Sequence, residues 1–206
     1  IDLLLSGITV GSLYALIAIG YTMVYGILRL INFAHGDIFM MSGFFMIYVS
    51  ATLPMAVSIP VVLLMTVLLG VLIERAAYKP LRSAPRMSVM ISAIGVSYLL
   101  QNLATYITGG LARPYPEISF LKKSFAVGSL NIKIITLLTP VLTILLVISL
   151  VIFIKHTKTG MAMRAVSKDF DTARLMGIKV NSVITVTFII GSFLAGVGSI
   201  LYFTNY

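Results

Sequence analysis

Five long stretches of this chain contain no Asp, Glu, Lys or Arg. They are Leu3–Leu28, Ile38–Ile73, Met87–Ala112, Ile134–Ile154 and Val180–Tyr206. A helix needs about 20 mainly apolar residues to cross roughly 30 Å of hydrocarbon, and every stretch reaches that length. A lone segment in lipid can satisfy its backbone hydrogen bonds only as a helix. The sequence therefore predicts an all-α fold, a polytopic transmembrane helical bundle.

The second stretch, Ile38–Ile73, is too long for one crossing. As a single helix it would extend about 54 Å at ~1.5 Å per residue. We therefore expect it to turn back where Pro54 and Pro60 lie. The chain then has about six hydrophobic segments in one transmembrane domain, residues 1–206. Only 10% of its residues are charged, against roughly 25% in soluble domains.

The basic residues gather in two loops between the hydrophobic segments. Residues Glu74–Arg86 carry four basic residues and one acid, and Lys155–Lys179 carry six and two. Cytoplasmic loops of membrane proteins are rich in Lys and Arg, so both loops are predicted to face the cytoplasm, two crossings apart. The net charge of +9 thus reflects orientation in the bilayer, and no nucleic-acid partner is expected. Gly109–Lys133, between the two crossings, is predicted to be an irregular external loop because it contains Pro and Gly.

A polar stretch, Asn32–Asp37, interrupts the pattern ahead of a short apolar run. That run, Ile38–Leu53, would form about 24 Å of helix, which is short for a crossing unless part of the polar stretch also lies at membrane depth. Polar groups at that depth usually face a cavity or a partner. Gly36 favours a break in the helix, and Gly-interrupted apolar segments are typical of transporter binding sites. The candidate translocation-pathway residues are Asn32, His35, Gly36 and Asp37.

Two alternatives remain open for this part of the chain. The polar stretch could be an ordinary cytoplasmic turn, with Arg29, His35 and Asp37 solvated at the membrane surface. The second segment could also be broken or re-entrant: residue 1 lies outside if Ile38–Leu53 crosses, and inside if it is re-entrant. No metal site is expected, because cysteine is absent and no further His or carboxylate has ligand spacing near this stretch.

Small residues recur at four-residue spacing in the first and last segments. Such faces let helix backbones approach closely in lipid. They pack either within this chain or against a second membrane subunit of the same kind. The two sets are Gly7, Gly11 and Ala15, and Gly191, Ala195 and Ser199.

A short helix is predicted inside the last basic loop, between Asp169 and Gly177. Asp169 is a good N-cap, and Gly177 can take the left-handed conformation that ends a helix. Phe170, Ala173 and Met176 or Gly177 form one apolar face. Because a helix this short is not stable alone, it either packs on its own bundle or docks into a groove of a partner.

Two stretches carry a family resemblance. Residues 11–26, GSLYALIAIGYTMVYG, are followed by residues 31–37, INFAHGD. Residues 164–178 contain Ala173 and Gly177 in an Ala-x-x-x-Gly spacing. Together they closely resemble LivH-type permeases, the inner-membrane subunits of branched-chain amino acid ABC importers. The likeness covers essentially the whole chain. Since that family continues with further spans, we expect this chain to be a C-terminally truncated fragment of the permease domain.

The resemblance implies a transport subunit that binds no cofactor itself. In such importers, cytoplasmic ABC ATPase subunits use the ATP, a second permease subunit completes the membrane part, and a periplasmic binding protein delivers the amino acid. The resemblance places the Asn32–Asp37 stretch beside a pathway that opens by alternating access. It also makes residues 155–179 a cytoplasmic coupling loop that meets the ATPase. The coupling residues that it implies are Phe170, Ala173, Arg174 and Gly177.

Three other functions are weighed against this one. A urea or short-amide ABC permease would share the mechanism with a different substrate. An ion-coupled secondary transporter should carry more ionisable residues within the membrane. An integral-membrane enzyme would need a catalytic motif, and the sequence has no His-Glu-x-x-His and no Gly-x-Ser-x-Gly. The sequence therefore predicts a multi-pass inner-membrane transport subunit, not an enzyme. The exact substrate and the pairing of the permease, homodimeric or heterodimeric, stay open.

Overall fold

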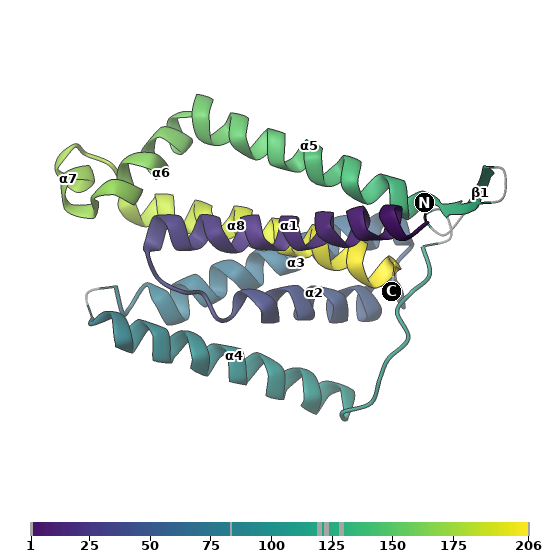
Figure 1. Cartoon of the computed structure of the whole chain (residues 1–206). Helices are drawn as coiled ribbons and strands as arrows, with labels where there is room; N and C mark the ends of the chain where they lie inside the picture. Colours follow the sequence, from purple (N-terminus) through teal and green to yellow (C-terminus); the bar gives the residue numbers. More distant parts are fainter. Residues whose placement is uncertain (1, 83, 119–120, 122–123, 128–129, 206) are drawn as a thin grey trace.

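The computed structural model describes residues 2–82, 84–118, 121, 124–127 and 130–205, and most of them are helical (Figure 1). The helices are α1 (Asp2–Leu28), α2 (His35–Ser50), α3 (Met55–Ile73), α4 (Arg86–Thr108), α5 (Ile134–His156), α6 (Lys158–Lys168), α7 (Phe170–Leu175) and α8 (Val180–Asn205). A π-helical turn, η1 (Glu74–Tyr78), continues α3. The predicted all-α fold is confirmed.

The loop between α4 and α5 contains a small antiparallel hairpin. Its strands are β1 (Ser124–Val127) and β2 (Leu130–Lys133), paired with Ser124 opposite Lys133. The prediction of an irregular loop is wrong for these two segments, which satisfy their backbone polar groups by pairing with each other. Residues 119–120, 122–123 and 128–129 of the predicted loop lie outside the described part.

In the described part of the chain, five helices are long and apolar enough to cross a membrane. They are Leu3–Leu28, Met55–Tyr78, Met87–Thr108, Ile134–His156 and Val180–Asn205. The second hydrophobic segment, α2, has only 16 residues. Figure 1 shows α2 running antiparallel to α1, from the half nearer α6 and α7 to the end where both termini lie. This direction favours a crossing over a re-entrant segment, with the start of α1 at Asp2 on the side opposite α6 and α7.

The turn between α2 and α3 is short. Pro54 is the N-cap of α3, as its place in the sequence suggested, but Pro60 lies inside α3. The prediction that Pro60 belongs to the turn is therefore wrong. Pro60 is the sixth residue of α3, so α3 continues through it with one helical hydrogen bond missing, the one that an N–H at this position would donate to the Ala56 carbonyl.

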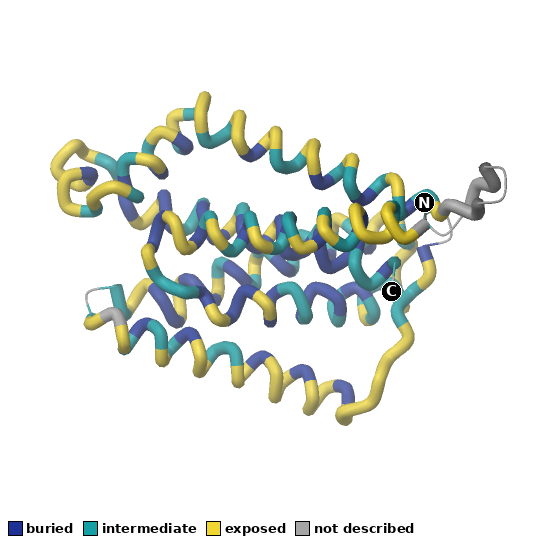
Figure 2. Tube along the Cα trace, in the orientation of Figure 1, coloured by how far each residue is buried: buried dark blue, intermediate teal, exposed yellow. Residues whose placement is uncertain are grey.

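The central helix is α8, which contacts α1, α2 and α3. In the most apolar stretch of α8, 67% of the residues are buried inside the protein, whereas the buried share is 17% to 28% in the other four spans. Figure 2 shows exposed residues concentrated on the outlying α4 and α5. Many of these are large and apolar, such as Leu99 and Ile144, as expected for faces that contact lipid.

The two sets of small residues have different surroundings. Gly191, Ala195 and Ser199 are buried in the bundle, so this face packs within the chain. A Cβ at Gly7 or Gly11 would meet no other atom within 4 Å, and both glycines are exposed. The face of α1 that carries them is therefore unoccupied within the described chain.

Candidate functional site

The polypeptide leaves helical geometry between α1 and α2, at Arg29–Ala34. Arg29 has a φ of 53°, the left-handed conformation that commonly ends a helix. The predicted break at Gly36 is thus wrong, because Gly36 lies in the first turn of α2. The break falls before His35, and the short α2 is preceded by irregular and turn backbone.

The Arg29 side chain connects this break to α6. Its Nη2 donates hydrogen bonds to the carbonyl oxygens of Ser167 (2.9 Å) and Lys168 (3.0 Å). Those carbonyls are at the end of α6 and would otherwise lack helical partners. The contact therefore ties the end of the first span to the end of α6, directly before Asp169.

Asn32 is buried inside the bundle. Its Oδ1 accepts a hydrogen bond from the Tyr78 hydroxyl of η1 (2.9 Å), and the Tyr78 ring packs on Phe188 of α8, with 5.1 Å between centroids. Its Nδ2 has no hydrogen-bond partner among the residues that the structure describes. A buried donor left unpaired costs about 1–3 kcal/mol, so this amide N–H can gain by meeting a polar group of a ligand.

His35 is the first residue of α2, and its side chain packs where α1 and α8 cross. A Cβ at Gly20 would lie 3.2 Å from His35 Nε2 and 3.3 Å from the Gly191 carbonyl oxygen. The imidazole also reaches the backbone of Ile17 and the ring of Tyr21, edge to face at 6.0 Å. Within the described chain, Nε2 has no hydrogen-bond partner of normal geometry. Glycines at the crossing thus make room for one imidazole between two spans.

Asp37 faces α4 instead. It is 7% exposed, and its Oδ1 accepts a hydrogen bond from Gln101 Nε2 (3.0 Å). The same nitrogen lies 3.1 Å from Ser97 Oγ. A buried carboxylate usually has a cationic partner, but the partner recorded here is a neutral amide. Such a carboxylate still attracts a positively charged group.

The four predicted pathway residues do not form one cluster. Asn32 contacts η1, His35 contacts α1 and α8, and Asp37 contacts α4. Gly36 is exposed, with no atom within 4 Å of the place where its Cβ would be. The solvated-turn alternative does not hold for His35 and Asp37, which are buried, although Arg29 is exposed. The stretch is a line of polar groups along the start of α2.

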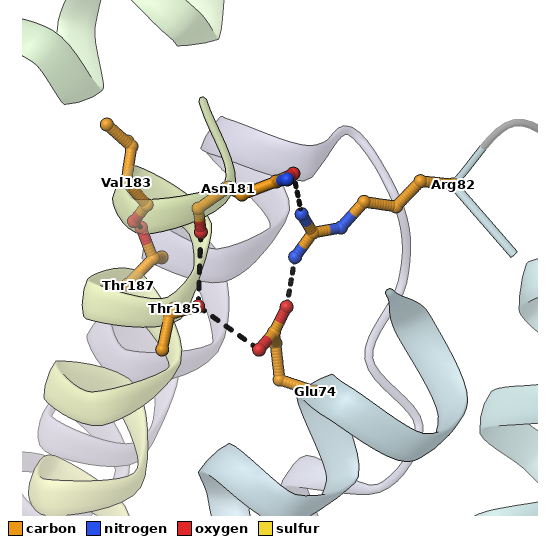
Figure 3. Close-up of polar contacts among 6 residues, drawn as sticks. All are labelled: Glu74, Arg82, Asn181, Val183, Thr185 and Thr187. Atoms are coloured by element: carbon orange, nitrogen blue, oxygen red, sulfur yellow. Dashed lines mark hydrogen bonds and ion pairs between the residues drawn. The ribbon is translucent and has the colours of Figure 1, made fainter. Parts of the chain in front are cut away.

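A second polar cluster lies at the end of α3, and the sequence did not reveal it (Figure 3). Glu74 is fully buried and forms an ion pair with Arg82. The other Arg82 nitrogen, Nη1, donates to Asn181 Oδ1 of α8. The Thr185 hydroxyl lies 3.2 Å from Glu74 Oε2 and 3.1 Å from the Asn181 carbonyl. This cluster joins η1 to the first turns of α8.

The sequence placed Glu74 in a solvated basic loop, but the helical structure of the span continues to Tyr78. The Lys79 N–H donates to the Glu74 carbonyl (2.8 Å), which is the five-residue spacing of a π-helix. Such turns are frequent at functional sites. The one available signal was a single acid directly after a long apolar run, followed by Arg82.

The short helix predicted between Asp169 and Gly177 is present as α7. Asp169 caps it by accepting hydrogen bonds from the N–H groups of Asp171 (2.8 Å) and Thr172 (3.2 Å), and Gly177 has a φ of 79°. The Thr172 N–H, the Thr172 hydroxyl and the Asp171 N–H hold the pKa of the Asp169 carboxyl below its ordinary value. The predicted capping of the helix is confirmed at both ends.

The apolar face of α7 is turned toward its own bundle. Ala173 is buried, and Phe170 is half-buried against the main core. Arg174 is exposed, together with Leu175 (87%) and Met176 (77%). Of the residues predicted to couple, Phe170 and Ala173 thus position the helix. Arg174, Leu175 and Met176 form the surface that a partner can reach.

A cavity of about 500 Å³ lies between α7 and the ends of the spans. Its lining includes Arg29, Arg82, Lys168, Asp169 and Arg174. Burial lowers the pKa of Arg82, nearby Glu74 raises it and Arg174 lowers it, but a guanidinium keeps its charge in proteins. The cavity therefore brings the break after α1, the buried ion pair and α7 to one place.

The described residues contain no group of three or more His, Cys, Asp or Glu that could hold a metal ion. The site is instead a line of buried polar groups at the break before α2 and in its first turn, among membrane-length helices and next to α7, whose tip is exposed. Such an arrangement suits the passage of a small polar molecule and its control from one side of the membrane.

Comparison with known proteins gives a consistent result. Residues 3–206 match the family described as the permease component of branched-chain amino acid transport systems. A high-affinity branched-chain amino acid permease protein from Pseudomonas aeruginosa, BraD, is 39% identical over 98% of this chain and 70% of its own length. LivH from Salmonella typhimurium is 38% identical over 95% of this chain and 68% of its own length. A probable LivH from Methanocaldococcus jannaschii is 28% identical over 93% of this chain and 63% of its own length. No solved structure matches the chain significantly.

Proposed function

Since the chain belongs to the permease family of branched-chain amino acid transport systems, we propose that it carries leucine, isoleucine and valine across the bacterial inner membrane by alternating access. The observation that supports this most directly is the Asn32–Asp37 stretch, with its buried polar side chains at a helix break inside a bundle of spans. Asn32, His35 and Asp37 then border the pathway, and Gly36 keeps the start of α2 free of side-chain bulk.

The proposed transporter has four kinds of component. Cytoplasmic ABC ATPase subunits hydrolyse the ATP, a periplasmic binding protein delivers the amino acid, and this chain pairs with a second permease subunit. The unoccupied face of α1 at Gly7 and Gly11 supports the pairing, because small residues let helices of two subunits approach closely in lipid. This chain itself binds no cofactor.

The contacts of Arg29 suggest how ATP use reaches the pathway. The ATPase presses on the exposed tip of α7, formed by Arg174, Leu175 and Met176. Because Asp169 joins α7 to the end of α6, the Ser167 and Lys168 carbonyls shift with it. Arg29, which is bonded to both carbonyls, then moves the unwound stretch that contains Asn32.

The function is tested with the full-length permease, its ATPase, its partner permease and its binding protein in proteoliposomes. We expect ATP-dependent uptake of labelled leucine that unlabelled valine competes for and urea does not. Uptake blocked by urea would change the substrate to a short amide. Uptake that continues without ATP would overturn the mechanism.

The coupling role of α7 is tested at Gly177. Gly177→Pro is expected to abolish uptake while the protein still reaches the membrane, because proline cannot adopt the positive φ that ends this helix. Gly177→Asn is the matched control, since asparagine tolerates the left-handed conformation, and it should keep most of the uptake. Wild-type uptake in Gly177→Pro would remove α7 from the mechanism.

A further inference from the structure

A small apolar cavity of about 130 Å³ lies between α2 and α4. Its walls include Met41 and Phe44 from α2 and Ala104 and Ile107 from α4. Thr108 also lines it, but its hydroxyl donates to the Ala104 carbonyl of its own helix (2.9 Å). The cavity is thus suited to a hydrocarbon group and offers little to a polar one.

A polar contact joins the same two helices one turn away. Asp37 lies four residues before Met41, and Gln101 lies three residues before Ala104, so each pair shares a helix face. The hydrogen bond between Asp37 and Gln101 therefore lies at one end of the crevice, about 5 Å along the helix from the apolar cavity. The crevice has a carboxylate and an amide at one end and an apolar pocket at the other.

We propose that this crevice between α2 and α4 is the subsite that binds an amino acid by its branched aliphatic side chain. The ammonium group meets the Asp37 carboxylate, the Gln101 amide N–H turns to the substrate carboxylate, and the side chain enters the cavity. This proposal rests on the proposed function and assigns its substrate-selecting residues.

The size of the cavity fits this ligand. An apolar cavity of about 150 Å³ takes up benzene in another protein, so 130 Å³ accommodates the four carbons of an isobutyl group. Charge fits as well, because Asp37 has a neutral partner and can gain a charge-assisted hydrogen bond from an ammonium group.

The geometry of α4 gives the direction of access. Tyr48 and Ile107, which line the cavity, are 43% and 49% exposed, so the cavity opens at their level. Figure 1 shows this part of α2 and α4 toward the end that carries both termini, away from α6 and α7. A substrate released on the outer side therefore meets the apolar pocket of the crevice before the buried Asp37.

The test changes the volume of the cavity and measures selectivity. In the complete transporter, Ala104→Leu fills the cavity and is expected to lower the ratio of leucine to valine uptake about tenfold, the effect of one methylene in a tight apolar pocket. Ile107→Ala enlarges it and should let phenylalanine compete with leucine at roughly tenfold lower concentration than in wild type. Ile91→Ala is the matched control: it lies on the same helix, is 65% exposed and does not line the cavity.

The outcomes separate this proposal from the proposed function. If wild type imports leucine but both Ala104→Leu and Ile107→Ala keep wild-type selectivity, the crevice is not the subsite and the function stands. If wild type imports no branched-chain amino acid, the proposed function itself fails. Should Ala104→Leu not reach the membrane, Ile107→Ala against Ile91→Ala decides alone, because both variants only shorten exposed side chains.

Discussion

Two buried acidic side chains in this bundle, Glu74 and Asp37, have opposite kinds of partner. Glu74 is paired with the guanidinium of Arg82, whereas Asp37 accepts a hydrogen bond from the neutral amide of Gln101. A buried charge is costly unless it is paired, so the first arrangement is complete without a ligand. The Asp37 carboxylate, which has only a neutral partner in the described part of the chain, still attracts a cation. Burial alone thus does not distinguish a structural acid from a binding one, but the charge of its partner does.

The largest effect is expected from breaking the ion pair between Glu74 and Arg82. Arg82→Met keeps most of the side-chain volume but leaves the Glu74 carboxylate buried without a cation. Removing one partner of a buried ion pair costs about 3–5 kcal/mol. Because Arg82 retains 16% exposure of its side chain, we expect about 3 kcal/mol. The loss is measured as the free energy of unfolding and as the amount of protein in the membrane.

A matched control for this variant is Arg75, next to Glu74 in the chain. Arg75 belongs to the π-helical turn that contains Glu74 but is exposed, so Arg75→Met should leave stability nearly unchanged. Equal losses in the two variants would show that general basic charge, and not the buried pair, stabilises this end of the bundle.

The next effect is expected in transport, not in stability. Asp37→Asn keeps the size and can still accept from Gln101, but it removes the charge. Hydrogen bonds to charged groups contribute about 1.5–3 kcal/mol, so uptake should fall on the order of 10- to 100-fold, with normal abundance in the membrane. Glu74→Gln, the same chemical change at the other acid, should instead reduce abundance. If Asp37→Asn lost stability and kept its uptake per molecule, Asp37 would be a structural acid like Glu74 and not a binding one.

The sequence predicted those features that depend on local chemistry. The uncharged runs correspond to the spans, and Asp169 and Gly177 end α7 as their side chains suggested. Both kinds of inference use residues within one helix or one turn, where length, capping and backbone preference act directly.

The missed features depend on residues that are distant in the chain. Glu74 looks like a loop residue until Thr185 of α8 and Arg82 are seen beside it. Gln101 is uncharged, so its pairing with Asp37 leaves no trace in a charge pattern. The break between α1 and α2 was assigned to Gly36 because glycine favours breaks. It falls instead at Arg29, which is held by carbonyls of α6 that no local pattern could indicate.

Arg29 and Arg82 provide a second comparison. Both are arginines near the large cavity, but Arg29 is exposed and bonds to neutral carbonyls. Arg29→Gln should therefore leave stability near wild type while lowering uptake about fivefold, the size of one ordinary hydrogen bond of ~1 kcal/mol. ATP hydrolysis by the complete transporter should persist, so the number of amino acids imported per ATP should fall. Lys158→Gln, which removes an exposed basic charge from α6, is the control, and an equal drop there would rule out a specific link.

The smallest effect concerns Asp169, an acid that is exposed and bonded to backbone N–H groups. Its pKa is lower in the folded state than in the unfolded chain, because the Thr172 N–H, the Thr172 hydroxyl and the Asp171 N–H stabilise the carboxylate. The capping contribution is therefore complete above the ordinary Asp pKa and is lost as pH falls through the lowered, folded-state value.

Asp169→Asn keeps a good N-cap but does not titrate. At neutral pH we expect the Asp171 and Thr172 amides to exchange with deuterium more slowly in wild type than in Asp169→Asn, on the order of fivefold or less. This advantage should disappear in acid, below the folded-state pKa. A difference between the two proteins that stays constant with pH would show that the cap acts through its geometry alone and not through its charge.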